Sequence, residues 1–112
     1  MTNDIDRKIA EKVMKWEYSR NFRCYVYQDE ELVFNKTNWH PTTNIEQAMM
    51  VVKRMVELGW CPEMQYHFDS KKYLFLFRWH EQPYQQASPV FGHSDESLTV
   101  AICEAALNTL DR

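Results

Sequence analysis

The sequence is poor in glycine and has no long apolar run. Only Gly59 and Gly92 occur among 112 residues. Two isolated glycines cannot form the glycine-rich loop that cradles phosphates, so Rossmann-type and P-loop nucleotide sites are excluded. No apolar run approaches the ~20 residues that a membrane-spanning helix needs, and the charged start of the chain is unlike a signal peptide. We therefore expect a cytoplasmic protein with no membrane partner.

Cysteine and excess positive charge are also scarce. The three cysteines, Cys24, Cys61 and Cys103, are odd in number and widely spaced, which does not suit a disulfide framework. The formal charge of −3 gives no general attraction to nucleic acid, so we expect no nucleic-acid partner. No pair of histidines or cysteines has metal-ligand spacing. The expectation is a protein without a metal or another cofactor.

What the chain does contain is enough apolar material for a folded domain. Hydrophobic residues make up 45% of the sequence and aromatic residues 14%, and 112 residues is the length of one domain. Apolar positions recur at helical spacing over residues 4–16, 45–58 and 98–110. In the second helix the expected core-facing stripe is Ile45, Ala48, Met49, Val52, Met55 and Val56.

The ends of these helices carry recognisable stop and start residues. Asn44 with Gln47 resembles a capping box before the second helix, and Thr43 with Glu46 offers the same device one residue earlier. Gly59 stands where a left-handed residue ends that helix, and Ser97 precedes the last one.

Short β-prone runs lie between the helices. Residues 24–28 and 32–34 suggest a hairpin, and residues 63–69 and 73–79 suggest a second one. If Ser70 and Lys71 are its loop, Phe68 faces Tyr73 and Glu63 faces Arg78, while one face collects the aromatic side chains of Tyr66, Phe68, Tyr73, Phe75, Phe77 and Trp79. Residues 73–79 are apolar on both faces, which predicts a central strand.

Residues 81–94 have no period and read as a loop. The expected fold is therefore α/β, in the order α-β-β-α-β-β-α, with a mainly antiparallel sheet sandwiched by helices.

Two groups of residues are candidates for binding a ligand. The polar face of residues 63–69 carries Gln65 and His67, which with Arg78 and His80 can hold an anionic group. The simpler reading is a Glu63–Arg78 ion pair on a solvated face, and we favour it. Trp39 and His40 precede the second helix, where Trp39 is expected to close the edge of the core.

Three segments taken together resemble a known family. They are "IAEKVMKWE" from Ile9, "WHPTTNIEQA" from Trp39, and "AICEAAL" from Ala101. Their order and spacing resemble the phage ABA-sandwich domain family, although "QDEEL" and "DSKKY" depart from its middle. The resemblance implies one α/β sandwich domain over residues 1–112 and a phage or prophage origin, with no settled activity and no catalytic residues.

The first functional hypothesis is a non-catalytic accessory protein that acts by binding a host or phage protein. Self-association is expected, because a domain this small cannot cover so many aromatic side chains alone. One alternative is an oligomer that sequesters a nucleotide-derived signal of host defence. A second alternative is a small hydrolase with His40, His67 or His80 as its base.

Overall fold

The computed structural model describes residues 2–19, 24–26, 32–35, 38–79 and 90–111. The helical segments in these residues are α1 (Thr2–Lys8), the π-helical η1 (Ile9–Val13), α2 (Ile45–Glu57), α3 (Leu98–Asn108) and the 3-10 turn η2 (Thr109–Asp111). The strands are β1 (Glu17–Ser19), β2 (Cys24–Val26), β3 (Leu32–Asn35), β4 (Trp60–His67), β5 (Lys72–Trp79) and β6 (Val90–Asp95).

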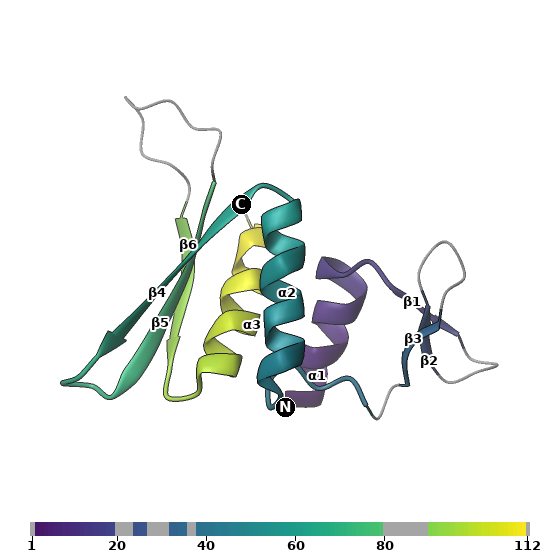
Figure 1. The fold of residues 1–112 in the computed structure, drawn as a ribbon, viewed down its shortest axis with the longest axis horizontal. Coiled ribbons are helices and arrows are strands. Elements are labelled where there is room, and N and C mark those ends of the chain that lie inside the picture. The colour runs from purple at the N-terminus through teal and green to yellow at the C-terminus, as the bar shows by residue number, and fades with distance from the viewer. Residues whose placement is uncertain (1, 20–23, 27–31, 36–37, 80–89, 112) are drawn as a thin grey trace.

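The helices form a middle layer between two antiparallel sheets (Figure 1). The larger sheet has the strand order β4-β5-β6 and packs on α3, while the small sheet β1-β2-β3 lies beyond α1. The mixed α/β class and the antiparallel pairing are confirmed. All three α-helices lie on the same side of the larger sheet, so no helix of the described residues covers its other face.

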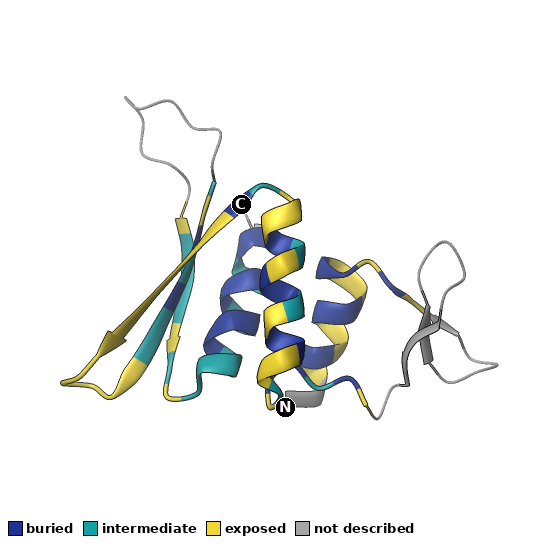
Figure 2. Cartoon of the chain, in the orientation of Figure 1, coloured by how far each residue is buried: buried dark blue, intermediate teal, exposed yellow. Residues whose placement is uncertain are grey.

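The core lies between the helices and the inner face of the larger sheet (Figure 2). Its most deeply buried side chains include Ile9, Val13, Val51, Met55, Phe77 and Ile102. Small buried residues on α3, such as Ala101, Ala105 and Ala106, allow close approach of its neighbours. None of the helices in the described part of the chain is long and apolar enough to span a membrane.

Helix α2 is turned relative to its predicted stripe. Ile45, Met49 and Val56 are about half exposed, while Val51 is fully buried. The buried face instead centres on Ala48, Val51, Val52 and Met55, and it includes the polar Gln47. Hydrophobicity alone missed this rotation, because Gln47 uses its amide to hold the preceding loop and is drawn inward with it.

The β4–β5 hairpin has a different register from the predicted one. Tyr66 faces Tyr73 and Glu63 faces Leu76, so the predicted opposition of Glu63 and Arg78 is wrong by two residues. The loop is residues 68–71 rather than Ser70 and Lys71, with Lys71 in the left-handed conformation at φ 58° and its N–H donating to the carbonyl of His67. Because the shift is an even number, every side chain keeps its predicted face.

Two strands were missing from the predicted order. Residues 90–94, expected in a loop, belong to β6, which pairs with β5 and makes β5 central as predicted. Residues 80–89 lie outside the described part of the chain. The polar segment after the first helix contains β1, which pairs with β2 and extends the predicted hairpin of residues 24–28 and 32–34. Pairing with a neighbouring strand, rather than local hydrophobicity, gives β1 and β6 their conformation.

Candidate functional site

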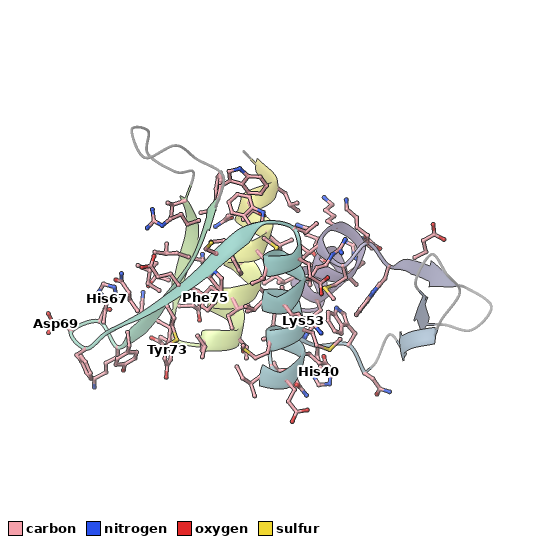
Figure 3. The ribbon with its side chains drawn as sticks, turned by 45° about the horizontal axis from the view of Figure 1, so that its top comes forward. His40, Lys53, His67, Asp69, Tyr73 and Phe75 are labelled. Carbon is pink, nitrogen blue, oxygen red and sulfur yellow. The ribbon has the colours of Figure 1, made fainter. Side chains whose placement is uncertain are left out.

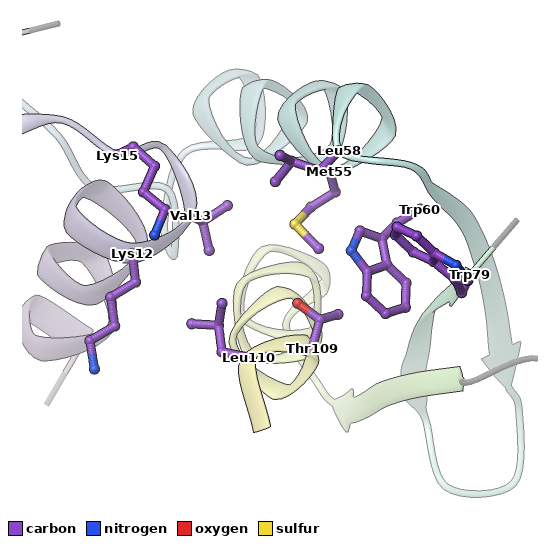
Figure 4. Close-up of a pocket in the computed structure, with 9 residues that line it drawn as sticks. All are labelled: Lys12, Val13, Lys15, Met55, Leu58, Trp60, Trp79, Thr109 and Leu110. Atoms are coloured by element: carbon purple, nitrogen blue, oxygen red, sulfur yellow. The ribbon is translucent and has the colours of Figure 1, made fainter. Parts of the chain in front are cut away.

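A pocket of about 340 Å³ opens where the first helix, the end of α2 and the end of α3 meet the larger sheet (Figure 4). We call it the lysine–tryptophan pocket. Its lining residues are Lys12, Val13, Lys15, Met55, Leu58, Trp60, Trp79, Thr109 and Leu110. Figure 4 shows the two lysines on one side, the two tryptophans on the other, and Val13, Met55 and Leu110 between them.

The tryptophan side of the pocket is fixed by strand pairing. Trp60 and Trp79 are direct cross-strand partners, and their rings meet edge to face with centroids 5.0 Å apart. Trp60 also meets Phe91 of β6 edge to face. Gly59, at φ 105°, ends α2 in the left-handed conformation and turns the chain directly into Trp60. Strand pairing and these ring contacts therefore fix the position of a largely apolar aromatic wall.

The lysine side is shaped by the end of the first helix. Lys15 has φ 61°, a left-handed conformation that non-glycine residues rarely adopt, and the Trp16 N–H donates to the carbonyl of Ala10 across this turn. Arg54 of α2 donates to the carbonyl of Val13 over 3.2 Å, which joins the helix end to α2. The turn places Lys15 at the rim near Lys12.

The charge at the pocket is positive. No acidic residue lines it. The ion pairs between described residues use Arg7, Arg54 and Arg78, and His93 lies 3.9 Å from Asp95; neither pocket lysine takes part in these contacts. Two lysines across the pocket from an apolar wall can attract an anion that also carries an apolar body.

A second feature is an aromatic surface at the free end of the β4–β5 hairpin. We call it the hairpin surface, made of Met64, Tyr66, Phe68 and Tyr73. It continues the sheet face whose Phe75 and Phe77 are buried by the helices. Tyr66 packs on Phe68 and Tyr73 with ring centroids 5.1 and 4.8 Å away. Even so, Phe68 remains 83% exposed and Met64 51% exposed.

The predicted polar cluster shares one face of the sheet but does not converge. Gln65 and His67 lie on the outer face of β4, whereas Arg78 lies opposite Cys61 at the other end of that strand. Cys61 and His67 are six positions apart along the strand, a span of about 20 Å. Arg78 instead contacts Glu63 diagonally over 3.3 Å, with both side chains half exposed. His80 lies outside the described residues.

The other predicted residues build the start of α2. Trp39 is buried edge to face against Trp16, with centroids 4.6 Å apart, and its indole N–H donates to the carbonyl of Asp6. Asn44 is the N-cap and accepts from the N–H of Gln47 over 3.0 Å. The Gln47 side chain does not return to the cap as in a capping box. It bonds the backbone of Asn38 and His40 at 2.7 Å each.

The hydroxyl of Thr43 does not cap α2 either. It donates to the carbonyl of His40 and lies 3.2 Å from the His40 ring nitrogen Nδ1. His40 is thus engaged with its own turn, and Figure 3 shows it far from His67, which lies near the hairpin end. At the last helix, the Ser97 hydroxyl accepts from the N–H of Val100 over 3.3 Å.

Cys103 and Asp6 are titratable side chains that are buried within the fold. Cys103 is fully buried among the alanines of α3, and this burial strongly raises the pKa of its thiol, so the thiolate is not available at neutral pH. Burial also raises the pKa of Asp6, an effect partly offset by the hydrogen bond from the Thr42 N–H, whose nitrogen lies 3.1 Å from the carboxylate. Asp6 thereby joins α1 to the loop before α2.

The pocket was missed by sequence reasoning. No pattern marks Lys15 as the left-handed residue that ends the helix. The facing of Trp60 and Trp79 follows only when the hairpin loop has four residues, and with the expected two-residue loop Trp79 faces Pro62 instead. A four-residue loop is a common hairpin connection, so the sequence could have been read with this loop, and the facing tryptophans would then have been predicted.

Comparisons with known proteins agree with this architecture. A search of curated proteins finds none that matches the chain. Among solved structures, the crystal structure of a phage protein from Bacillus cereus ATCC 14579 is similar, with a TM-score of 0.69 and 21% sequence identity over 97% of this chain and 91% of that one. The model of the phage ABA sandwich domain matches residues 7–107. The chain therefore belongs to the phage ABA sandwich domain family.

Proposed function

We propose that this protein is a phage accessory protein that acts by binding, and that it binds a second copy of itself through the hairpin surface. The observation that carries the proposal is the exposed Phe68, which with Met64 and Tyr66 extends an aromatic face that is buried elsewhere in the molecule. Large apolar side chains gathered in one patch are typical of interaction sites. A second copy offers the same patch, so a two-fold arrangement can cover both at once.

The strand that carries this surface supports association through the face rather than through the strand edge. β4 is an edge strand of the described sheet and is exposed along nearly its whole length. Pro62 lacks a backbone donor and Glu63 adds charge, and both features hinder the pairing of edge strands. Side-chain packing of Tyr66 and Phe68 across a two-fold axis avoids that obstacle.

We favour binding over catalysis because the candidate reactive side chains are buried, held in a turn or far from one another. The Cys103 thiol is buried and protonated, and His40 contacts Thr43. His67 lies near the hairpin end, far from His40 (Figure 3). The described residues contain no group of three metal-ligating side chains that could hold a metal ion. The Thr43 hydroxyl that lies 3.2 Å from Nδ1 of His40 also donates to the His40 carbonyl, so this pair belongs to the turn before α2.

The proposal is tested by the mass of the protein in solution. We expect light scattering at micromolar concentrations to give twice the chain mass of 13.5 kDa. Phe68→Glu should convert the dimer to a monomer, because it places a carboxylate at the centre of the apolar contact. Since Phe68 is mostly exposed in the single chain, the substitution should not unfold the monomer, and the variant should still melt cooperatively.

Gln65→Glu is the matched control, because it adds the same charge to the outer face of the same hairpin. It should leave the dimer intact. A wild-type protein that stays monomeric at the highest attainable concentration would overturn the proposal. Equal dimerisation of both variants would show that the contact lies elsewhere and would equally reject the hairpin surface.

A further inference from the structure

The lysine–tryptophan pocket is separate from the hairpin surface and has no part in the proposed self-association. Its volume of about 340 Å³ lies at the small end of the range found for small-molecule sites. Such a volume suits a ligand with one or two aromatic rings rather than a peptide or a dinucleotide.

The floor and one wall of the pocket are mainly apolar, so they favour an apolar part of a ligand. Met55 is almost fully buried beneath it, and Trp60 and Trp79 form the wall. The one hydroxyl in the lining belongs to Thr109, and it donates to the carbonyl of Ala106 over 2.6 Å. A flat aromatic ring can lie against the carbon surface of this wall, and the two tryptophans also bring an indole N–H each to the lining.

The opposite rim of the pocket carries lysines, so it favours an anionic group of a ligand. Lys12 and Lys15 both line this side of the pocket, although Figure 4 shows the Lys12 ammonium directed away from the tryptophans. No carboxylate lines the pocket, and the net charge of the chain is −3. Attraction of an anion is therefore local to this rim and is not a property of the whole surface. Lys15 in particular occupies a backbone conformation for which glycine is the favoured residue.

We propose that the lysine–tryptophan pocket binds a small aromatic anion, with its ring against Trp60 and Trp79 and its acidic group at Lys12 and Lys15. A nucleoside monophosphate and an aromatic carboxylate share this chemistry. The ring and the charge contribute at opposite sides of the pocket, so neither alone accounts for binding.

Isothermal titration calorimetry with the full chain tests this proposal. The probes are AMP and indole-3-acetate as aromatic anions, with inorganic phosphate and adenosine as the separate halves of AMP. We expect saturable binding of at least one aromatic anion and much weaker binding of phosphate and of adenosine. AMP against indole-3-acetate then distinguishes a phosphate from a carboxylate.

Lys15→Gly is the decisive variant. Glycine relieves the left-handed conformation, so the melting temperature should not fall, while the loss of the ammonium should weaken binding of the aromatic anion by about tenfold. Leu110→Glu, at the exposed rim, should abolish binding by repulsion. Lys8→Ala, which removes an exposed lysine that does not line the pocket, should leave the affinity unchanged.

Three results would overturn the proposal: no saturable binding of either aromatic anion, binding of phosphate or adenosine as tight as that of AMP, or equal loss of affinity in Lys15→Gly and Lys8→Ala. The test is independent of self-association. Phe68→Glu should leave binding of the aromatic anion unchanged, and Lys15→Gly should leave the mass in solution unchanged.

Discussion

Gln47 shows how one polar side chain can organise a helix start. It occupies the third position of α2 and is nearly buried, yet its amide bonds two backbone groups of the loop that precedes the helix. Asn44 caps the first turn, and Gln47 fixes the direction from which the chain enters it. The two residues therefore contribute in different ways, although both appear as capping residues in the sequence.

This difference predicts a ranking of stability effects. Asn44→Ala should lower the free energy of unfolding by about 1 kcal/mol, the usual effect of a lost cap. Gln47→Met keeps the length and helix propensity of the side chain but leaves the N–H of His40 without its acceptor, and it should cost about 2 kcal/mol. Urea denaturation measures both values.

Thr43→Ala is the control for that pair of substitutions, because the exposed Thr43 hydroxyl contacts only its own turn. It should change the free energy of unfolding by less than about 0.5 kcal/mol. If Asn44→Ala proves more damaging than Gln47→Met, the loop is held by something other than the Gln47 amide.

At the scale of elements, β6 depends on the close approach of its backbone to β5. A Cβ added at Gly92 would lie 2.3 Å from Cδ2 of Leu76 and 2.9 Å from the backbone oxygen of Phe75. The Leu76 side chain can turn aside, but the Phe75 carbonyl belongs to the central strand and cannot. The carbonyl of Gly92 also accepts from the side chain of Asn108, so the strand is tied to α3 at the same residue.

Gly92→Ala should therefore destabilise the protein by about 1–3 kcal/mol, as overpacking of a tight contact does. Ser94→Ala, two residues along the same face of β6, is exposed and should have little effect. Thermal unfolding of the two variants compares them directly. A neutral Gly92→Ala would mean that β6 can move away from β5 at no cost.

The elements that local sequence predicts are those with both a periodic body and clear ends. α2 has a cap at Asn44, a left-handed stop at Gly59 and Pro62 beyond, and its bounds agree with the prediction. β6 has no such signals, since its sequence "VFGHSD" alternates poorly and contains a glycine. It becomes a strand because β5 offers it an open edge, and that information is not local.

At the scale of the whole molecule, the titration of Asp6 makes the free energy of unfolding depend on pH. Its carboxylate is buried between α1 and the loop before α2, and burial raises its pKa above the ordinary value of 3.8. The folded state therefore holds this proton more tightly than the unfolded state. The stabilisation is complete below pH 3.8 and is lost as the pH rises through the raised pKa.

Asp6→Asn removes this titration and keeps an oxygen that can accept from the N–H of Thr42. We expect the melting temperature of the variant, relative to the wild type, to increase as the pH rises from below 3.8 and then to level off above the raised pKa. Melting curves across this range provide the measurement. A difference that grows toward acid instead would show that the Asp6 carboxylate is favoured by its surroundings.

The candidate sites, like the elements of the fold, were predictable only where the local sequence carries the information. The aromatic face of the β4–β5 hairpin was predictable, because alternation assigns faces whatever the register. The lysine–tryptophan pocket was not, because it needs residues from both ends of the chain and a left-handed Lys15. The polar residues Gln65, His67 and Arg78 were placed on the correct face, but only the register shows how far apart they lie.

The pairing of the tryptophans has an optical consequence. All four indoles of the chain fall into two edge-to-face pairs, Trp16 with Trp39 in the helical core and Trp60 with Trp79 in the wall of the pocket. Indoles held this closely and rigidly couple their electronic transitions and give strong near-ultraviolet circular dichroism. The protein thus contains two built-in chromophores, one that reports on the helical layer and one that reports on the larger sheet, and Trp→Phe substitution in either pair isolates the other.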